Sequence, residues 1–126
     1  MQIKSFLSML IVLLFSINVA FAKSNTIHLH KSQPKFIITL ESNRTTGYSW
    51  SLKDYDNKLI RLINHEYLKP NSNLIGAPGH DQWVFQGNPA FFTNAKPIVL
   101  TLNYARSWEH GKNIKTVTYK ITPVNN

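Results

Sequence analysis

The side chains that could carry out catalysis are few in this sequence and form no known catalytic motif. The chain has 6 acidic residues, 5 histidines and no cysteine, which excludes a thiol nucleophile, a thiolate metal site and a disulfide. It contains no Gly-x-Ser-x-Gly, phosphate-binding or dinucleotide-binding motif. His28 and His30 share one face of a predicted strand, but two histidines without further ligands are more often solvent-facing. We therefore expect no catalytic residue, no metal site and no cofactor.

Three loops carry side chains that are typical of a protein-binding surface. They span residues 43–48, 75–80 and 104–109. Tryptophan and arginine are enriched among residues that dominate binding energy, and loops stiffened by glycine or proline turns lose little entropy on docking. We therefore predict a binding site formed by Asn43, Arg44, Thr45, Thr46, Gly47, Tyr48, Gly76, Ala77, Pro78, Gly79, Arg106, Ser107 and Trp108.

The first of these loops begins as a turn and ends as a strand. Asn43 and Gly47 tolerate backbone angles that most residues avoid, and we expect a positive φ at Gly47. The β-branched pair Thr45 and Thr46 is stiff about χ1 and suits a loop that must hold its shape. We expect Thr46 to provide a small contact that can be deleted without disturbing the turn.

The segments that must position these loops alternate between apolar and polar residues, as strands do when one face is buried. Turn signals separate them, and no long helix is predicted, although the segment 59–68 could form a short helix instead of a strand. The alternating segments are 26–30, 35–41, 48–52, 59–68, 82–86, 96–104 and 114–121. This pattern predicts an all-β antiparallel sandwich or barrel.

The order of the strands predicts where the loops emerge. In a sandwich with simple alternation of strand direction, the first and third loops lie at the same end, and the second joins them if the segment before it crosses the molecule. Trp50 and Trp83 alternate with apolar neighbours and are predicted to lie in the core. Trp108 lies in a polar loop and is predicted to be exposed.

Residues 1–22 have the pattern of a secretory signal peptide. A lysine precedes an apolar run at 6–19, and Ala20-Phe21-Ala22 has the small-x-small pattern of a cleavage site. A transmembrane anchor is the alternative, but the run is short for a membrane span. We expect cleavage after Ala22, a mature domain of residues 23–126 that is secreted or periplasmic, and no membrane association after cleavage.

The chain is strongly basic, with a formal net charge of +8 at pH 7. Basic proteins can bind nucleic acids, anionic glycans or acidic proteins, but the lysines are dispersed here and form no basic run. A solvated positive surface is therefore favoured, and we expect no nucleic-acid partner. The alternative function is a secreted basic module that binds an anionic glycan or another surface ligand, and such binding would depend strongly on salt.

The motifs of the three loops resemble those of the chagasin-like inhibitors of papain-family cysteine proteases. That family carries an Asn-Pro-Thr-Thr-Gly-Tyr/Phe loop, a Gly-x-Pro-Gly loop followed by Trp-x-Phe, and an Arg-Pro-Trp loop. The corresponding segments stand in the same order and extend across nearly all of the predicted mature domain, at 43–48, 76–79 with 83–85, and 106–108. Arg44 and Ser107 occupy positions where the family has proline.

The resemblance implies an immunoglobulin-like antiparallel β-sandwich of about seven or eight strands. It also implies a monomeric, non-enzymatic inhibitor that binds papain-like, cathepsin-type cysteine proteases reversibly and tightly. The first loop would enter the catalytic cleft with Thr45 and Thr46 near the enzyme's cysteine–histidine pair, while the other two loops grip the walls. The two missing prolines imply more backbone freedom in their loops, and Arg44 is expected to add a charge near the loop tip.

Overall fold

The computed structural model describes residues 25–126, so the predicted signal peptide, residues 1–22, lies outside the described part of the chain. The described elements are β1 Asn25–His30, β2 Lys35–Ser42, the 3-10 helix η1 Arg44–Thr46, β3 Ser49–Asp54, β4 Ile60–Leu68, β5 Gly79–Gly87, α1 Pro89–Asn94, β6 Ile98–Ala105, the 3-10 helix η2 Ser107–Glu109 and β7 Lys115–Val124. Within this range, no helix has both the length and the apolar character needed to cross a membrane.

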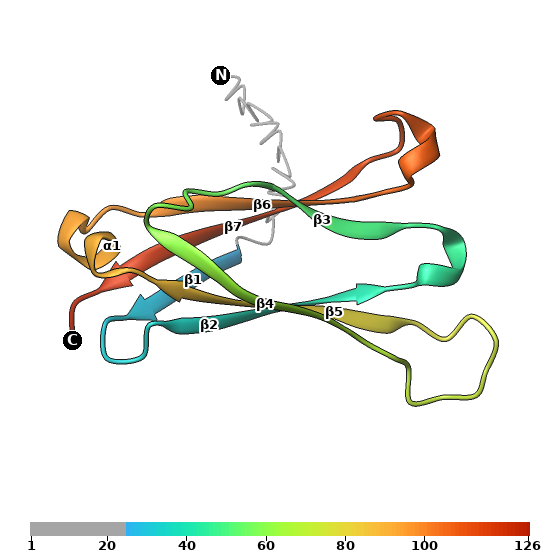
Figure 1. The fold of residues 1–126 in the computed structure, drawn as a ribbon, viewed down its shortest axis with the longest axis horizontal. Helices are drawn as coiled ribbons and strands as arrows, with labels where there is room; N and C mark the ends of the chain where they lie inside the picture. Colours follow the sequence, from blue (N-terminus) through green and yellow to red (C-terminus); the bar gives the residue numbers. More distant parts are fainter. Residues whose placement is uncertain (1–24) are drawn as a thin grey trace, which may run out of the picture.

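The strands form two sheets that pack face to face as a sandwich (Figure 1). The four-stranded sheet has the order β1-β7-β6-β3, and the three-stranded sheet has the order β2-β5-β4. The predicted all-β sandwich is therefore confirmed. Neighbouring strands run antiparallel except for β1 and β7, which pair in parallel with Ile27 opposite Ile121. This parallel pair joins the first and last strands of the described chain and was not predicted.

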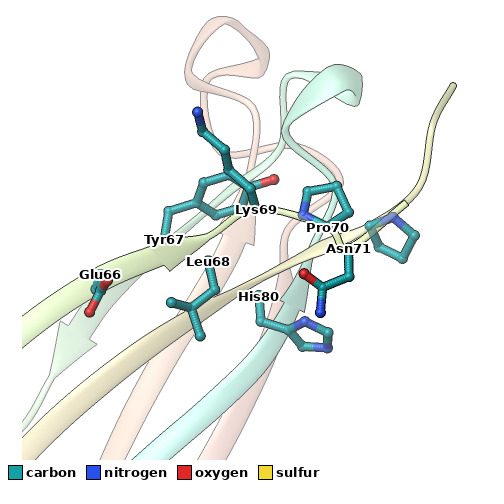
Figure 2. A pocket seen from close by; sticks show the side chains of 8 residues that line it. Glu66, Tyr67, Leu68, Lys69, Pro70, Asn71 and His80 are labelled. Carbon is teal, nitrogen blue, oxygen red and sulfur yellow. The ribbon is translucent and has the colours of Figure 1, made fainter. Parts of the chain in front are cut away.

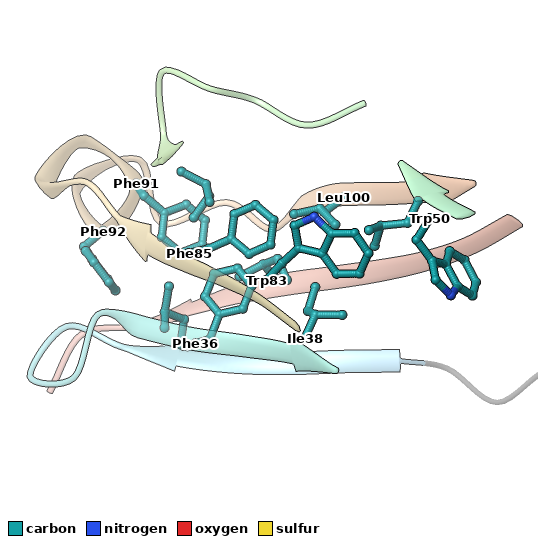
Figure 3. Close-up of a cluster of buried hydrophobic side chains, with 12 residues drawn as sticks. Phe36, Ile38, Trp50, Trp83, Phe85, Phe91, Phe92 and Leu100 are labelled. Carbon is teal, nitrogen blue, oxygen red and sulfur yellow. The ribbon is translucent and has the colours of Figure 1, made fainter. Parts of the chain in front are cut away.

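Alternating apolar residues along the strands build the core between the sheets (Figure 3). Phe36 and Ile38 on β2 lie opposite Phe85 and Trp83 on β5, and all four side chains are buried. The four-stranded sheet contributes the buried side chains of Leu29, Trp50, Leu100, Leu102 and Ile121. The predicted core positions of Trp50 and Trp83 are thus confirmed. Because protein interiors are close-packed, a core of this kind gives the loops a rigid base.

The sequence predicted the strand β4 but not the short helix α1. The segment 59–68 contains the strand β4, so the alternative of a short helix is wrong, and a β-bulge adapts this strand to its neighbour β5. The short helix α1 was not predicted, because Gly87-Asn88-Pro89 is also a typical signal for the end of a strand. Proline at the first helical position and the buried pair Phe91 and Phe92 explain this turn of helix.

Alternating strand direction brings the three predicted binding loops to one end of the sandwich. The chain reaches this end along β2, β4 and β6 and leaves it along β3, β5 and β7. In Figure 1 the three connections lie together on the right, whereas α1 lies at the opposite end. The crossing that the second loop requires is made by β4. We call this end the loop end and its connections the first, second and third loops, residues 43–48, 69–78 and 106–114.

Candidate functional site

The first loop is one turn of 3-10 helix that is closed by its own side chains. Asn43 caps the turn, because its Oδ1 accepts a hydrogen bond from the backbone N–H of Thr45. The hydroxyl of Thr45 also donates to Asn43 Oδ1, and the hydroxyl of Thr46 donates to the Asn43 carbonyl oxygen. Gly47 ends the turn with a φ of 82°, which confirms the predicted positive φ. The hydroxyl of Thr46 therefore helps to close the turn, a contact that was not expected, and the effect of deleting it stays a prediction.

Trp108 of the third loop lies directly against Gly47. Its indole occupies the space that a Cβ atom at position 47 would need, so packing and backbone conformation both demand glycine there. The Trp108 side chain is nevertheless 60% exposed, and its predicted exposure is confirmed. Trp108 therefore joins the first and third loops and still offers most of its surface to a partner.

Arg106 connects the same two loops through its guanidinium group. The Nε donates to the carbonyl oxygen of Thr46 at 2.8 Å, and the guanidinium lies 4.3 Å from the ring centroid of Tyr48. The Nη1 donates to Glu109 Oε1 at 2.9 Å. This hydrogen bond lowers the pKa of Glu109 below its ordinary value of 4.5, and a hydrogen bond from Asn113 adds to the effect. Arg106 thus holds the first and third loops together.

An aromatic stack supports the first loop from the four-stranded sheet. The ring of Tyr104 stacks on Tyr48 and on Trp50, with centroid distances of 5.0 and 4.7 Å. The hydroxyl oxygen of Tyr104 accepts a hydrogen bond from the backbone N–H of Asn43 at 3.1 Å. Asn43 also reaches the second loop, where its Nδ2 donates to the Gly76 carbonyl oxygen at 3.1 Å. One residue of the first loop is thereby tied to both β6 and the second loop.

The second loop exposes two large apolar side chains at its tip. Leu74 is 78% exposed and Ile75 is fully exposed. Gly76 follows with a φ of 80° and open space around it. The predicted site included the glycine–proline turn of this loop but omitted Leu74 and Ile75. Two adjacent apolar residues among asparagine, serine, glycine and proline were the signal that could have identified them.

A solvent-open hollow of about 660 Å³ lies at the base of the second loop (Figure 2). Charged, polar and apolar side chains line it together: Glu66, Tyr67, Leu68, Lys69, Pro70, Asn71, Pro78 and His80. Residues 25–126 contain no group of three side chains that could hold a metal ion, here or elsewhere. The hollow leaves the second loop without packing support on this side.

Arg44 is directed toward the three-stranded sheet. Its Nη2 donates to Asp81 Oδ1 at 3.1 Å, and its guanidinium lies 4.0 Å from the ring centroid of Tyr67. Asp81 belongs to β5 and Tyr67 to β4. The Arg44 side chain remains 49% exposed beside the first loop, but its charge is paired with a buried carboxylate, which the sequence did not indicate.

The structure brings all three predicted loops together but gives their residues different exposure. The exposed members are Arg44, Thr45, Thr46, Gly76, Pro78, Ser107 and Trp108, and the less exposed members are Asn43, Gly47, Tyr48, Ala77, Gly79 and Arg106. Among the latter, Asn43 and Arg106 cross-link the loops. A rigid sandwich whose cross-linked loops present exposed threonine, tryptophan and aliphatic side chains at one end belongs to the class of protein-binding modules.

Comparison with known sequences identifies the family. Residues 30–122 match the model of the chagasin family peptidase inhibitor I42. This match covers most of the chain and all three loops. The chain therefore belongs to the chagasin family of peptidase inhibitors, so its role is inhibition and not catalysis. No curated protein matches the sequence.

Solved structures show the same fold. The crystal structure of the cysteine protease inhibitor EhICP2 from Entamoeba histolytica is similar with a TM-score of 0.66, at 21% identity, over 80% of this chain and 87% of that chain. The solution structure of amebosin is similar with a TM-score of 0.55, at 25% identity, over 79% and 88%. PbICP-C, solved in complex with falcipain-2, has a TM-score of 0.55 at 17% identity, over 80% and 91%. These likenesses confirm the immunoglobulin-like sandwich.

Proposed function

We propose that this chain inhibits papain-like, cathepsin-type cysteine proteases by occluding the catalytic cleft with the loop end. The observation that carries the proposal is the cross-linking of the three loops into one surface. Asn43 joins the first loop to the second, and Arg106 joins the first to the third. Family membership supplies the inhibitory role, and the structurally similar PbICP-C is a protein that binds falcipain-2.

The first loop is the part that enters the cleft. Its 3-10 turn is only three residues long and includes the exposed pair Thr45 and Thr46. Internal hydrogen bonds from both hydroxyls hold the turn before any partner arrives. A preformed segment loses little conformational entropy on docking, so more of the contact energy appears as affinity. In this arrangement the two threonines lie next to the catalytic cysteine and histidine of the enzyme.

The other two loops contact the walls on either side of the cleft. Leu74 and Ile75 of the second loop and Trp108 of the third are exposed apolar side chains. Burying such side chains in a complex is favourable, and tryptophan is a frequent hot-spot residue. The second and third loops therefore supply contact area, while the first loop blocks the catalytic residues.

Inhibition by this route needs no covalent bond and leaves the inhibitor intact. Peptide cleavage requires a near-attack geometry, with the reacting atoms about 3–3.5 Å apart and aligned. The carbonyl oxygens of Asn43, Arg44 and Thr46 each accept a hydrogen bond within the loop end. These bonds hold the peptide groups of the turn in a helical conformation, and we expect the loop to resist cleavage.

The same proposal places the inhibitor outside the cytoplasm. The signal-peptide pattern of residues 1–22 supports secretion. Mass spectrometry of protein exported by an expressing bacterium should give a mature chain that begins at Lys23. A chain that keeps Met1 and stays in the cytoplasm would argue against export.

A titration tests the proposed inhibition. Purified residues 23–126 are added to papain and to a cathepsin while peptide hydrolysis is followed. We expect activity to fall to zero near equimolar inhibitor, with the inhibitor intact by mass spectrometry. A serine protease and a metalloprotease serve as controls and should keep their activity. The proposal fails if no papain-family enzyme is inhibited at micromolar inhibitor.

A further inference from the structure

Asp81 is a fully buried carboxylate next to the loop end. On β5 the buried residues alternate, so Asp81 shares the inward face of the three-stranded sheet with Trp83 and Phe85. It is the one buried ionisable residue within residues 25–126. Burying a carboxylate is unfavourable unless it is paired and hydrogen-bonded. The groups that contact Asp81 therefore decide whether this position is tolerable.

The side chains of Arg44 and His65 both bind the same carboxylate oxygen of Asp81. Oδ1 accepts hydrogen bonds from Arg44 Nη2 at 3.1 Å and from His65 Nε2 at 2.8 Å. His65 is itself fixed by stacking on Trp83, with ring centroids 4.2 Å apart and planes 5° apart. Within residues 25–126, no donor lies within hydrogen-bonding distance of Asp81 Oδ2. Loss of either partner would therefore leave this carboxylate poorly satisfied.

Arg44 is the member of this group that belongs to the first loop. Its guanidinium lies over the ring of Tyr67, which stands opposite Asp81 in the register of β4 and β5. Its carbonyl oxygen accepts the hydrogen bond from Gly47 N–H that closes the turn. The side chain of Arg44 is thus anchored to the three-stranded sheet, while its backbone is part of the turn.

We propose that Asp81 is a positioning residue for inhibition, which fixes the first loop by holding Arg44. This inference rests on the proposed function of the loop. The loop is then anchored to both sheets, through Tyr104 on the four-stranded sheet and through Asp81 on the three-stranded sheet. Arg44 acts through its pairing with Asp81 and not through a contact with the protease.

The free protein provides the first test, because it needs no protease. Amide hydrogen exchange of Thr46 and Gly47, whose N–H groups close the turn, is measured by NMR in the parent, Arg44→Ala and Asp81→Asn. We expect exchange to be about fivefold faster in both variants, because residues in one hydrogen-bonded network are coupled. The amides of Glu109 and Lys112 in the third loop should not change. Unchanged exchange at Thr46 and Gly47 in folded variants would overturn the inference, whether or not the chain inhibits papain.

A double-mutant cycle with papain provides the second test. We expect Arg44→Ala and Asp81→Asn each to raise the inhibition constant about fivefold, and the double variant to be no weaker than the weaker single variant, because both remove one shared interaction. If Asp81→Asn inhibits as well as the parent while Arg44→Ala does not, Arg44 contacts the protease directly and the inference is wrong. If the effects of the two substitutions on the inhibition constant multiply in the double variant, Arg44 and Asp81 act independently and the inference is also wrong.

Two further variants control for charge and for folding. Arg61→Ala removes one positive charge at the opposite end of the sandwich, where Arg61 is exposed on β4, and should leave inhibition unchanged. Arg44→Lys keeps a cation in reach of Asp81 and should restore part of the loss seen in Arg44→Ala. If Asp81→Asn does not fold, the exchange rates of Arg44→Ala and Arg44→Lys decide: equal and parent-like rates in both would refute the inference.

Discussion

The first and third loops are interlocked, whereas the second loop stands largely apart. Arg106 and Trp108 of the third loop contact Thr46 and Gly47 of the first by a hydrogen bond and by close packing. Among residues 25–126, a single side-chain hydrogen bond, from Asn43 to Gly76, ties the second loop to the first. A hollow opens at the base of the second loop, and its tip is exposed. The loop end therefore combines a preformed part with a less supported one.

This difference assigns separate tasks to the two regions. A preformed loop presents its contacts at little entropic cost, which suits the part that must fit a narrow cleft. A less supported loop with exposed aliphatic side chains gains from burying apolar area and tolerates variation in the surface it meets. We therefore expect the interlocked loops to control the affinity for all target enzymes and the second loop to adjust the preference among them.

The largest expected effect is that of Gly47→Val. A side chain at this position must displace the indole of Trp108 and adopt a positive φ, which costs about 1 kcal/mol or more for a residue other than glycine. We expect the inhibition constant for papain to rise at least tenfold, equivalent to about 1.4 kcal/mol. Stopped-flow measurements should place the change mainly in the dissociation rate.

The matched control is Gly76→Val in the second loop. Gly76 has a similar φ of 80°, but a Cβ atom there would meet no other group. This variant bears the backbone strain of about 1 kcal/mol without the clash, so we expect the inhibition constant to rise about fivefold. If Gly76→Val weakens inhibition more than Gly47→Val does, the second loop and not the interlocked loops would control the affinity.

The next effect concerns Trp108→Ala, which removes the exposed side chain that joins the interlocked loops. We expect about a tenfold weaker inhibition of papain, typical of a hot-spot residue, with a nearly unchanged melting temperature because the side chain is largely exposed. Trp83→Ala is the contrasting variant: it empties a buried site and should cost about 3–5 kcal/mol of stability. If Trp108→Ala and Trp83→Ala have comparable melting temperatures, the assignment of Trp83 to the core and of Trp108 to the surface is wrong.

A smaller effect is expected for Ile75→Ser at the tip of the second loop. Ile75 is fully exposed in the free protein, and partial burial against a protease is worth about 1 kcal/mol, or about fivefold in the inhibition constant. The loss should differ between papain and a cathepsin. Ile37→Ser changes an exposed isoleucine on β2 and should leave both constants unaltered. If Ile75→Ser and Ile37→Ser weaken inhibition equally, the second loop has no specific role in binding the protease.

Thr46 provides a finer test of the preformed turn. Thr46→Val deletes the hydroxyl that donates to the Asn43 carbonyl and accepts from Tyr48 N–H, whereas Thr46→Ser keeps it. With about 1 kcal/mol for a net hydrogen bond, we expect about fivefold or less weakening for valine and a near-parent constant for serine. If Thr46→Val inhibits papain like the parent while Thr46→Ser is weak, the methyl group matters and the hydroxyl does not.

The smallest effect involves Glu109 and pH. Arg106 lowers the pKa of Glu109, so the charged form is favoured in the folded protein, and its contribution is present above the ordinary pKa of 4.5. That contribution is lost as pH falls through the lowered folded pKa. The melting temperatures of the parent and Glu109→Gln should therefore differ slightly at pH 6 and converge at the acid end of a titration. A difference in melting temperature that grows as the pH falls would contradict the lowered pKa of Glu109.

Much of the fold could be predicted because burial on one face imposes a period of two on each strand. Phe36 and Ile38, and likewise Leu100 and Leu102, point inward as that period requires. The parallel pairing of β1 with β7 could not be predicted in this way, since it depends on contacts between the two ends of the described chain. The helix α1 is so short that a proline and two phenylalanines were its only sequence signals.

The loops of the site could be located from the sequence, but the directions of their arginines could not. Arg44 pairs with Asp81, which lies 37 residues away in the sequence, and this pairing requires that β5 lies beside β2, the strand that precedes Arg44. Arg106 bonds to the carbonyl oxygen of Thr46, a backbone atom that no sequence pattern marks. Both arginines were predicted to belong to the binding surface, and both also make intramolecular contacts that position the first loop.

The central claim is that the loop end is the surface that meets the protease. Amide hydrogen exchange of the full mature chain, free and bound to papain, tests it most directly. We predict slower exchange in the complex at residues 43–48, 74–79 and 106–109, with unchanged exchange in α1 and in the turn between β1 and β2. Inhibition of papain without added protection at 43–48, or with protection centred on α1, would contradict the account.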